Sequence, residues 1–253
     1  MEWRVQQTDE GYLIHDAALD VVPARWMFDP AALVEQGWVA ARGAAGRGQV
    51  LFFDPPIPGN DGQWVLRHYL RGGSVARVLG DRYLWTGLRR SRPWREFLLT
   101  AEMRDLGLPV PRPVAARIVR AGPYYRADLV TQRIPDARPL DSRLRTEAVS
   151  ALTWHRVGVC IRQFHDAGYC HADLNSRNIL LDVCGRVWLL DWDRGRQRAA
   201  GAWREGNLAR LRRDLEKRLH LLDRWHFSER DFAALLSGYR NPNAAPPADP
   251  TGG

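Results

Sequence analysis

The first half of the chain contains short apolar runs of the kind that form β-strands. Glycine- or proline-rich stretches bound each run, and such boundaries mark strand ends. The runs are Gly37–Ala40, Gln49–Phe53, Gln63–Leu70, Ala116–Val119 and Tyr124–Ile134. Between them, Phe97, Leu98 and Ala101 recur at helical spacing and predict a helix over residues 93–106. Residues 1–35 hold only short apolar runs and a turn.

The second half changes to the three- and four-residue periodicity of helices. Apolar residues from Val149 to Phe164 predict a long helix over residues 147–168, with Gly168 as its stop. Regularly spaced leucines predict a helix over residues 203–222, and a shorter one follows over residues 229–240. The fold class is therefore expected to be α+β, with a strand-rich N-terminal lobe and a helical C-terminal lobe.

The domain limits follow from the same pattern. We expect an N-terminal lobe over residues 1–134 and a C-terminal lobe over residues 135–240, with residues 135–140 as a loop at their junction. Residues 241–253 are rich in proline, alanine and glycine, which predicts a disordered tail.

Composition narrows the class of partner. The formal net charge is +8, and Lys217 is the only lysine among the basic residues. This balance favours an anionic partner such as phosphate, an acidic sugar, an anionic membrane surface or nucleic acid; a solvated basic surface is the alternative. No apolar run is long enough to cross a bilayer, and the acidic N-terminus is unlike a secretory signal. Three cysteines without metal-type pairing predict reduced thiols in a cytoplasmic protein.

The candidate chemistry lies in Cys170–Leu181 and Trp188–Gly195. Asn178 follows Asp173 by five positions, and Asp191 ends an apolar strand thirteen positions later. Phosphoryl transfer needs a carboxylate that orients a hydroxyl and oxygen ligands that hold magnesium against phosphates. We therefore predict that Asp173 is catalytic and that Asn178 and Asp191 bind the metal.

Neighbouring residues leave alternatives open. Asp193 rivals Asp191 as metal ligand, although a role in orienting the loop by hydrogen bonds is preferred for it. His171 is expected to pack the loop in preference to acting as a general base. Asn175 and Arg177 lie inside the loop and are equally compatible with contacts to the acceptor or a phosphate and with solvated positions.

The order of these residues resembles the protein-kinase catalytic loop, His-x-Asp-Leu-x-x-x-Asn followed by an Asp-x-x triplet. The chain more closely resembles the bacterial lipopolysaccharide-kinase family, and within it the branch of 3-deoxy-D-manno-octulosonic acid (Kdo) kinases. The Arg-His-Tyr-x-Arg-Gly-Gly stretch narrows the resemblance to this branch, over about residues 30–240. The segments that carry it are Trp64–Tyr69, Arg71–Gly73, Asp81–Gly87, Gly107–Pro113, His171–Leu181 and Asp191–Gly195.

The resemblance implies a protein-kinase-like fold and transfer of the ATP γ-phosphate to the 4-hydroxyl of Kdo on a lipid A precursor. It also implies ATP and Mg²⁺ as cofactors and a peripheral position at the cytoplasmic face of the inner membrane. Glu96 would pair with a phosphate-binding base. The site residues that it implies are Asp173 as catalytic residue, Asn178 and Asp191 as metal ligands, and Gly43, Gly46 and Gly48 in a glycine loop over the phosphates.

The chain departs from the kinase pattern at the phosphate-binding lysine. The best match to the position of this lysine is Arg67, with Arg71 or Arg77 as alternatives. The planar guanidinium of arginine binds phosphate or carboxylate in a bidentate way that lysine does not. The triplet reads Asp-Trp-Asp, and no Ala-Pro-Glu element follows it. A small-molecule or glycolipid acceptor is therefore expected in place of a protein.

Partner predictions follow from charge. Arginines after Asp191 are candidates for binding a sugar carboxylate or lipid phosphates, with solvated positions as the alternative. No nucleic-acid motif appears, so no nucleic-acid partner is expected.

Rival functions are a kinase for another sugar, such as a core heptose, and a non-catalytic module that binds anionic lipid. An aminoglycoside-like acceptor is disfavoured by the basic charge. The arginines after Asp191 that are candidates for binding an anionic acceptor are Arg194, Arg196, Arg198, Arg204, Arg210, Arg212 and Arg213.

Overall fold

The structure is a computed structural model that describes residues 1–19, 23–45, 48–57, 62–70 and 80–243. The chain forms two compact units. The first comprises Met1–Leu106 and Pro111–Pro135, and the second comprises Gly107–Val110 and the chain from Asp136 onward. Gly107–Val110 joins the second unit through a hydrogen bond from the Leu189 amide to the Pro109 carbonyl, 3.0 Å. The predicted tail lies, from residue 244 on, outside the described residues.

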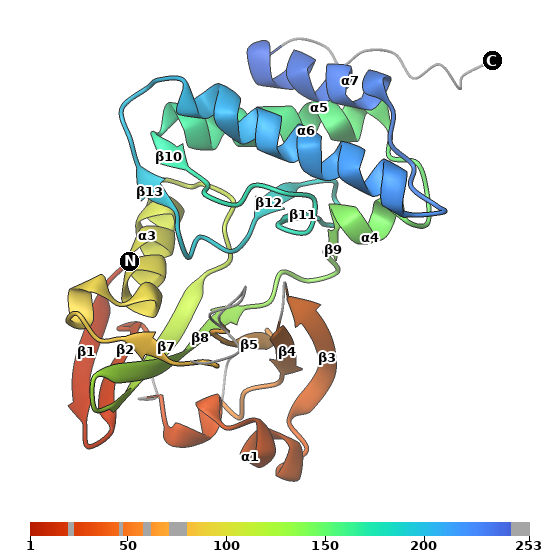
Figure 1. The fold of residues 1–253 in the computed structure, drawn as a ribbon. Coiled ribbons are helices and arrows are strands. Elements are labelled where there is room, and N and C mark those ends of the chain that lie inside the picture. Colours follow the sequence, from red (N-terminus) through yellow and green to blue (C-terminus); the bar gives the residue numbers. More distant parts are fainter. Residues whose placement is uncertain (20–22, 46–47, 58–61, 71–79, 244–253) are drawn as a thin grey trace. The chain divides into compact units, whose positions relative to one another are not determined.

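The described part of the first unit is built on an eight-stranded antiparallel sheet (Figure 1). Its strand order is β1-β2-β7-β8-β5-β4-β3, and β6 pairs with β8 outside this path. Strand β5, which carries Arg67, is therefore paired on both sides. The strands are β1 (Trp3–Thr8), β2 (Gly11–Asp16), β3 (Val39–Ala45), β4 (Gly48–Phe53), β5 (Trp64–His68), β6 (Tyr83–Leu84), β7 (Pro113–Ala121) and β8 (Tyr124–Gln132).

Alternating side chains bury both faces of this sheet. Residues at adjacent positions, such as Leu13 and Ile14 in β2, enter two different hydrophobic clusters, because successive side chains of a strand point to opposite faces. The short helices η1 (Arg25–Phe28) and α1 (Pro30–Glu35) contribute to one cluster, and α3 (Arg92–Asp105) contributes to the other (Figure 1). Helix α3 begins after η2 (Leu88–Arg90).

Two sequence predictions in this unit are wrong in extent. Residues 1–35, given no element, contain β1, β2, η1 and α1, because short elements carry too few residues to show a period. The glycine loop predicted around Gly43, Gly46 and Gly48 is strand in its described part, residues 41–45 and 48. Gly43 pairs with Val50, and pairing continues to Ala45 and Gly48.

The described part of the second unit is mainly helical. Helix α5 contacts both α6 and α7 (Figure 1): the Nε2 of its His165 faces the Asn207 side chain of α6 at 3.4 Å, and its Arg162 donates to the Tyr239 carbonyl of α7. Residues 138–144, predicted in part as loop, form a strand and a helix. The elements are β9 (Arg138–Pro139), α4 (Leu140–Leu144), α5 (Ala151–Asp166), β10 (Tyr169–Cys170), β11 (Ile179–Leu181), β12 (Val187–Leu189), β13 (Arg196–Gln197), α6 (Trp203–Leu221) and α7 (Glu229–Arg240).

The prediction of a strand-rich N-terminal part and a helical C-terminal part is confirmed. In the described ranges, none of the helices is both long and apolar enough to span a bilayer. The three cysteines are unpaired: Cys160 and Cys170 are buried, and Cys184 is exposed.

Candidate active site

The loop between β10 and β11 brings the predicted catalytic residues of the second unit together. Asn178 donates its side-chain nitrogen to the carbonyl of Asp173 over 2.9 Å. Its backbone carbonyl accepts from the amide of Leu190 at 2.9 Å. Asp191 follows Leu190 directly, so Asn178 links the Asp173 end of the loop to the Asp191 end of strand β12.

Asn175 organises the same loop from within. Its side-chain nitrogen donates to the Asp173 carbonyl at 2.9 Å and to a carboxylate oxygen of Asp173 at 3.2 Å. Its side-chain oxygen accepts the amides of Arg177 and Asn178 at 3.0 and 3.3 Å. Asn175, which the sequence left open between a ligand contact and a solvated position, thus contacts the loop itself and steadies the Asp173 side chain.

His171 holds the loop in the way that the sequence favoured. The imidazole is 2% exposed and packs against Trp192 at a centroid distance of 4.5 Å. Nε2 faces the Leu190 carbonyl at 2.7 Å, and Nδ1 accepts the Asp173 amide at 3.1 Å. Both bonds need the neutral imidazole with its proton on Nε2. Burial lowers the pKa of His171 and favours this neutral form.

Asp191 adopts an unusual backbone conformation at the end of β12. Its φ angle is +62°, in the left-handed region that few residues other than glycine enter. The amide and carbonyl of the preceding Leu190 are held by Asn178 and His171, as described above. Because such conformations cost of order 1–3 kcal/mol and cluster at functional sites, the fixed backbone favours a functional role for this carboxylate.

One face of helix α6 contacts the loop at three places. The Asn207 side-chain oxygen accepts the His171 amide at 3.1 Å, and Asp214 accepts the amide and the hydroxyl of the fully buried Ser176 at 2.9 and 2.6 Å. Nη1 of Arg210 lies 3.1 Å from the Asp173 carboxylate. Spacings of three and four residues place these side chains on one helix face.

Asn207 and Asp214 were not predicted from the sequence, and Arg210 was predicted only as one of seven arginines that could bind an anion. A signal was present: Asn207 lies beside Leu208 in an otherwise leucine-lined pattern, and a polar residue on the buried face of a helix needs a partner. The partner itself could not be identified, because the loop lies more than thirty residues earlier in the chain.

The first unit holds the predicted phosphate-binding base. Nη2 of Arg67 on β5 lies 2.5 Å from Oε2 of Glu96 on α3, and the Tyr69 hydroxyl donates to the same oxygen. Glu96 is 4% exposed. The structure therefore brings the half-buried Arg67 and the buried Glu96 into one ion pair. Arg71 and Arg77, the alternatives to Arg67, lie outside the described residues.

The structure describes two of the three glycines predicted to contact the phosphates. Gly43 is in β3 and Gly48 begins β4, which pairs with β3; Gly46 lies outside the described residues. A Cβ at Gly43 would approach the Phe52 ring to 2.8 Å. This close approach gives Gly43 a packing reason independent of any ligand.

His68, next to Arg67, lies between two carboxylates. Nδ1 is 2.7 Å from Asp128 and Nε2 is 3.1 Å from Asp81. The hydrogen bond with Asp128, aided by the charges of both carboxylates, raises the pKa of His68 above its ordinary value against the opposing effect of burial. Arg117 also binds Asp128, and Arg126 binds Asp81. His68 thus belongs to a charged network at the end of β5.

The side-chain oxygens of Asn178 and Asp191 suit magnesium better than a metal that needs a full set of protein ligands. Within the described ranges, no three His, Cys, Asp or Glu side chains gather into a metal site. Mg²⁺ commonly takes one or two protein oxygens together with phosphates and water. The Asn178 nitrogen donates to Asp173, so its amide oxygen is the atom left to bind a cation, and Asp191 lies at the linked strand end.

An α+β fold with an Asp–Asn loop, an aspartate after a short strand and a buried Arg–Glu pair is that of a protein-kinase-like enzyme. The comparisons with known proteins specify the family. The model of the Lipopolysaccharide kinase (Kdo/WaaP) family matches residues 38–239. The chain therefore belongs to this family of kinases, and kinase membership implies the use of ATP.

Similar curated proteins agree with this assignment. A protein named 3-deoxy-D-manno-octulosonic acid kinase from Vibrio vulnificus (strain CMCP6) is 35% identical over 238 residues, which cover 93% of this chain and 98% of the relative. A protein of the same name from Stenotrophomonas maltophilia (strain K279a) is 48% identical over 176 residues, 69% of each chain. Another from Vibrio cholerae is 40% identical over 174 residues, 69% of this chain and 72% of the relative.

Proposed function

We propose that this protein uses ATP to phosphorylate the 4-hydroxyl of Kdo on a lipid A precursor. The observation that carries the proposal is the hydrogen-bonded loop that links Asp173, Asn178 and the strand end at Asp191. The names of the similar proteins support the choice of acceptor. The acidic sugar and its phosphorylated lipid also match the net charge of +8.

Asp173 has the exposure and the support that the reaction needs. Its side chain is 61% exposed, so an acceptor hydroxyl can reach it, and Asn175 and His171 hold its carboxylate and its amide. In the proposed step, the acceptor oxygen forms a bond to the γ-phosphorus while the bond from that phosphorus to the β–γ bridging oxygen breaks. The hydroxyl proton passes to Asp173, and ADP leaves.

The other site residues have supporting roles. Arg67, oriented by Glu96 and Tyr69, would bind a phosphate of ATP. Asn178 and Asp191 would hold Mg²⁺, which when bound neutralises charge on the phosphate oxygens. Gly43, Gly46 and Gly48 would bind the nucleotide phosphates through backbone amides.

The test compares two aspartate variants of the same charge change. Asp173→Asn should reduce phosphorylation of Kdo-bearing lipid A precursor by about 10³-fold or more, a size within the span of general-base effects. Asp223→Asn, at an exposed position of the second unit, should keep wild-type activity. Mass analysis of the product should place one phosphate on Kdo. Phosphate on a heptose, or lipid binding without turnover in the wild type, would reject this function.

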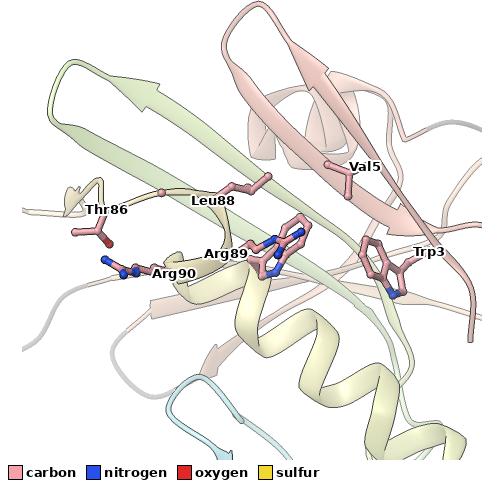
Figure 2. Close-up of a pocket in the computed structure, with 8 residues that line it drawn as sticks. Trp3, Val5, Thr86, Leu88, Arg89 and Arg90 are labelled. Carbon is pink, nitrogen blue, oxygen red and sulfur yellow. The ribbon is translucent and has the colours of Figure 1, made fainter.

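An apolar hollow in the first unit supports the proposed peripheral contact with an anionic membrane. It measures about 550 Å³, and Figure 2 shows Trp3 and Val5 of β1 on one side and Leu88 on the other. Trp3 is 41% exposed. Arg89 and Arg90 of η2 are exposed at its edge and have no acceptor in the described part of the chain. Interfacial tryptophan beside arginine suits an anionic lipid surface.

Membrane contact can be tested by co-sedimentation with vesicles. The variant Arg89→Ala/Arg90→Ala should lose most of its binding to vesicles that contain anionic phospholipid, and Trp3→Ala should weaken it further. Arg143→Ala/Arg212→Ala removes the same charge from residues that bind glutamates in the second unit and should bind as the wild type does. Equal binding by both double variants would exclude this surface.

A further inference from the structure

Arg210 stands out among the arginines because its partner is the predicted catalytic carboxylate. Its Nη1 lies 3.1 Å from Oδ1 of Asp173, and its side chain is 49% exposed. In the described part of the chain this is its only polar contact. The guanidinium carries five N–H donors in a planar fork, and the Asp173 carboxylate is the one acceptor that contacts it within the described residues.

Two other arginines of the predicted cluster on this helix have different surroundings. Arg204 donates to the His165 carbonyl and pairs with Asp166. Arg212 is paired with Glu216 and Glu229. These residues are held by the protein itself, whereas Arg210 presents its fork at the reacting group.

Arg210 also begins a basic stripe on α6. Arg213 and Lys217 follow at three and seven positions, so the three side chains share one face of the helix. Arg213 and Lys217 are exposed, and neither has a hydrogen-bond or ion-pair partner in the residues that the structure describes. An anionic molecule that reached Asp173 along this face would meet three cations in succession.

Stability does not explain the Arg210–Asp173 pair. Both side chains are about half exposed, and exposed ion pairs contribute only about 0.2–1 kcal/mol to folding. The pair also lowers the freedom of a carboxylate that Asn175 already holds. A role toward a ligand accounts better for a half-exposed fork at this position.

We infer that Arg210 binds the carboxylate of an acidic sugar while Asp173 receives the proton of that sugar's hydroxyl, with Arg213 and Lys217 guiding the anionic acceptor. This inference rests on the proposed function, and it adds Arg210 as the residue that selects an acidic acceptor. In a 2-keto sugar acid the carboxylate and the 4-hydroxyl are separated by only a few bonds. A guanidinium in contact with Asp173 is therefore placed to bind the one group while Asp173 contacts the other.

The experiment measures two acceptors, the Kdo-bearing lipid and its carboxyl-reduced analogue, with wild-type protein and Arg210→Ala. The wild type should prefer the acid. Arg210→Ala should lower kcat/KM for the acid by about 10- to 100-fold, the loss expected for a hydrogen bond to a charged group. It should leave kcat/KM for the reduced analogue nearly unchanged, so that the preference disappears. Arg213→Ala should show a smaller loss, carried by KM.

Arg212→Ala is the matched control, because it removes one arginine from the same helix away from Asp173. It should keep both the activity and the preference. If Arg210→Ala loses the same factor on both acceptors, Arg210 acts only on Asp173 and the inference is wrong. If the wild type phosphorylates neither acceptor, the proposed function itself fails, and this inference fails with it.

Discussion

The two units hold their key carboxylates in opposite ways. In the first unit, Glu96 is almost fully buried, its charge is paired with Arg67, and it accepts a hydrogen bond from Tyr69. In the second, Asp173 is largely exposed, and its loop is fixed mostly by amides, carbonyls and neutral side chains. A buried charge must be matched by another charge, whereas an exposed reactive group needs only a loop held at a fixed position.

The histidines near these carboxylates, His68 and His171, favour opposite protonation states. His68 lies between Asp81 and Asp128 and favours its charged form. His171 is buried among apolar and backbone groups and favours its neutral form. Glu96 and His68 are thus surrounded by charged partners, whereas the loop around Asp173 and His171 is fixed mainly by backbone and neutral side-chain hydrogen bonds. Substitutions and changes of pH test this difference.

The two units should differ most in the free energy of unfolding that is lost when Glu96 or Asp173 is replaced by alanine. Glu96→Ala leaves Arg67 without its partner and should lower the free energy of unfolding by about 2–3 kcal/mol. Asp173→Ala breaks an exposed ion pair with Arg210 and an exposed hydrogen bond from Asn175, and it should change this free energy by less than about 1 kcal/mol. Urea unfolding of both variants measures the contrast, and Glu96→Gln, which keeps an acceptor for Tyr69, should fall between them. Equal losses for the two alanine variants would contradict the comparison.

A smaller contrast is expected from packing. A Cβ on Gly158 of α5 would lie 1.9 Å from the Leu235 carbonyl of α7, whereas at Gly43 it would meet the side chain of Phe52. Backbone cannot move aside as a ring can, so Gly158→Ala should cost about 1–3 kcal/mol and Gly43→Ala less.

The control for both is an open glycine on helix α6. A Cβ on Gly206 would meet nothing within 4 Å, so Gly206→Ala should raise stability by about 0.4–1 kcal/mol. Thermal unfolding would show the order of the three variants. A Gly158→Ala protein as stable as the wild type would mean that α5 and α7 are packed less closely than described.

The smallest contrast is expected in pH dependence. The pKa of His68 is raised above 6.5, so the folded state binds its proton more tightly and the stabilisation is present below pH 6.5 and lost as the pH rises through the raised pKa. Burial lowers the pKa of His165 from 6.5 to about 4. Its neutral form therefore stabilises the fold above pH 6.5, and this contribution falls between pH 6.5 and about 4.

Two variants separate these effects. The stability lost in His68→Gln should be largest near pH 6 and shrink toward higher pH. The stability lost in His165→Gln should be larger at pH 8 than at pH 5. Unfolding free energies measured across this range give both trends. The same trend for both variants would show that the two histidines share one electrostatic environment.

Local patterns determined much of the fold. Helical periodicity predicted α3, α5, α6 and α7 close to their observed limits, because each is long and has one apolar face. The short elements β1, η1, α1 and α4 were not predicted, because they show no period and form through contacts with distant segments. The prediction of a glycine loop was wrong in extent, because strand pairing and not composition sets where a strand ends.

The sequence by itself determined which residues are the candidates for phosphoryl transfer, because Asp173, Asn178 and Asp191 follow a fixed order within one short stretch. Only the tertiary structure decided what supports them. Asn207, Arg210 and Asp214 reach the loop from a helix far along the chain, and Glu96 reaches Arg67 across two elements. Hydrogen bonds and ion pairs depend on distance in space, and spacing along the chain predicts that distance only within one element.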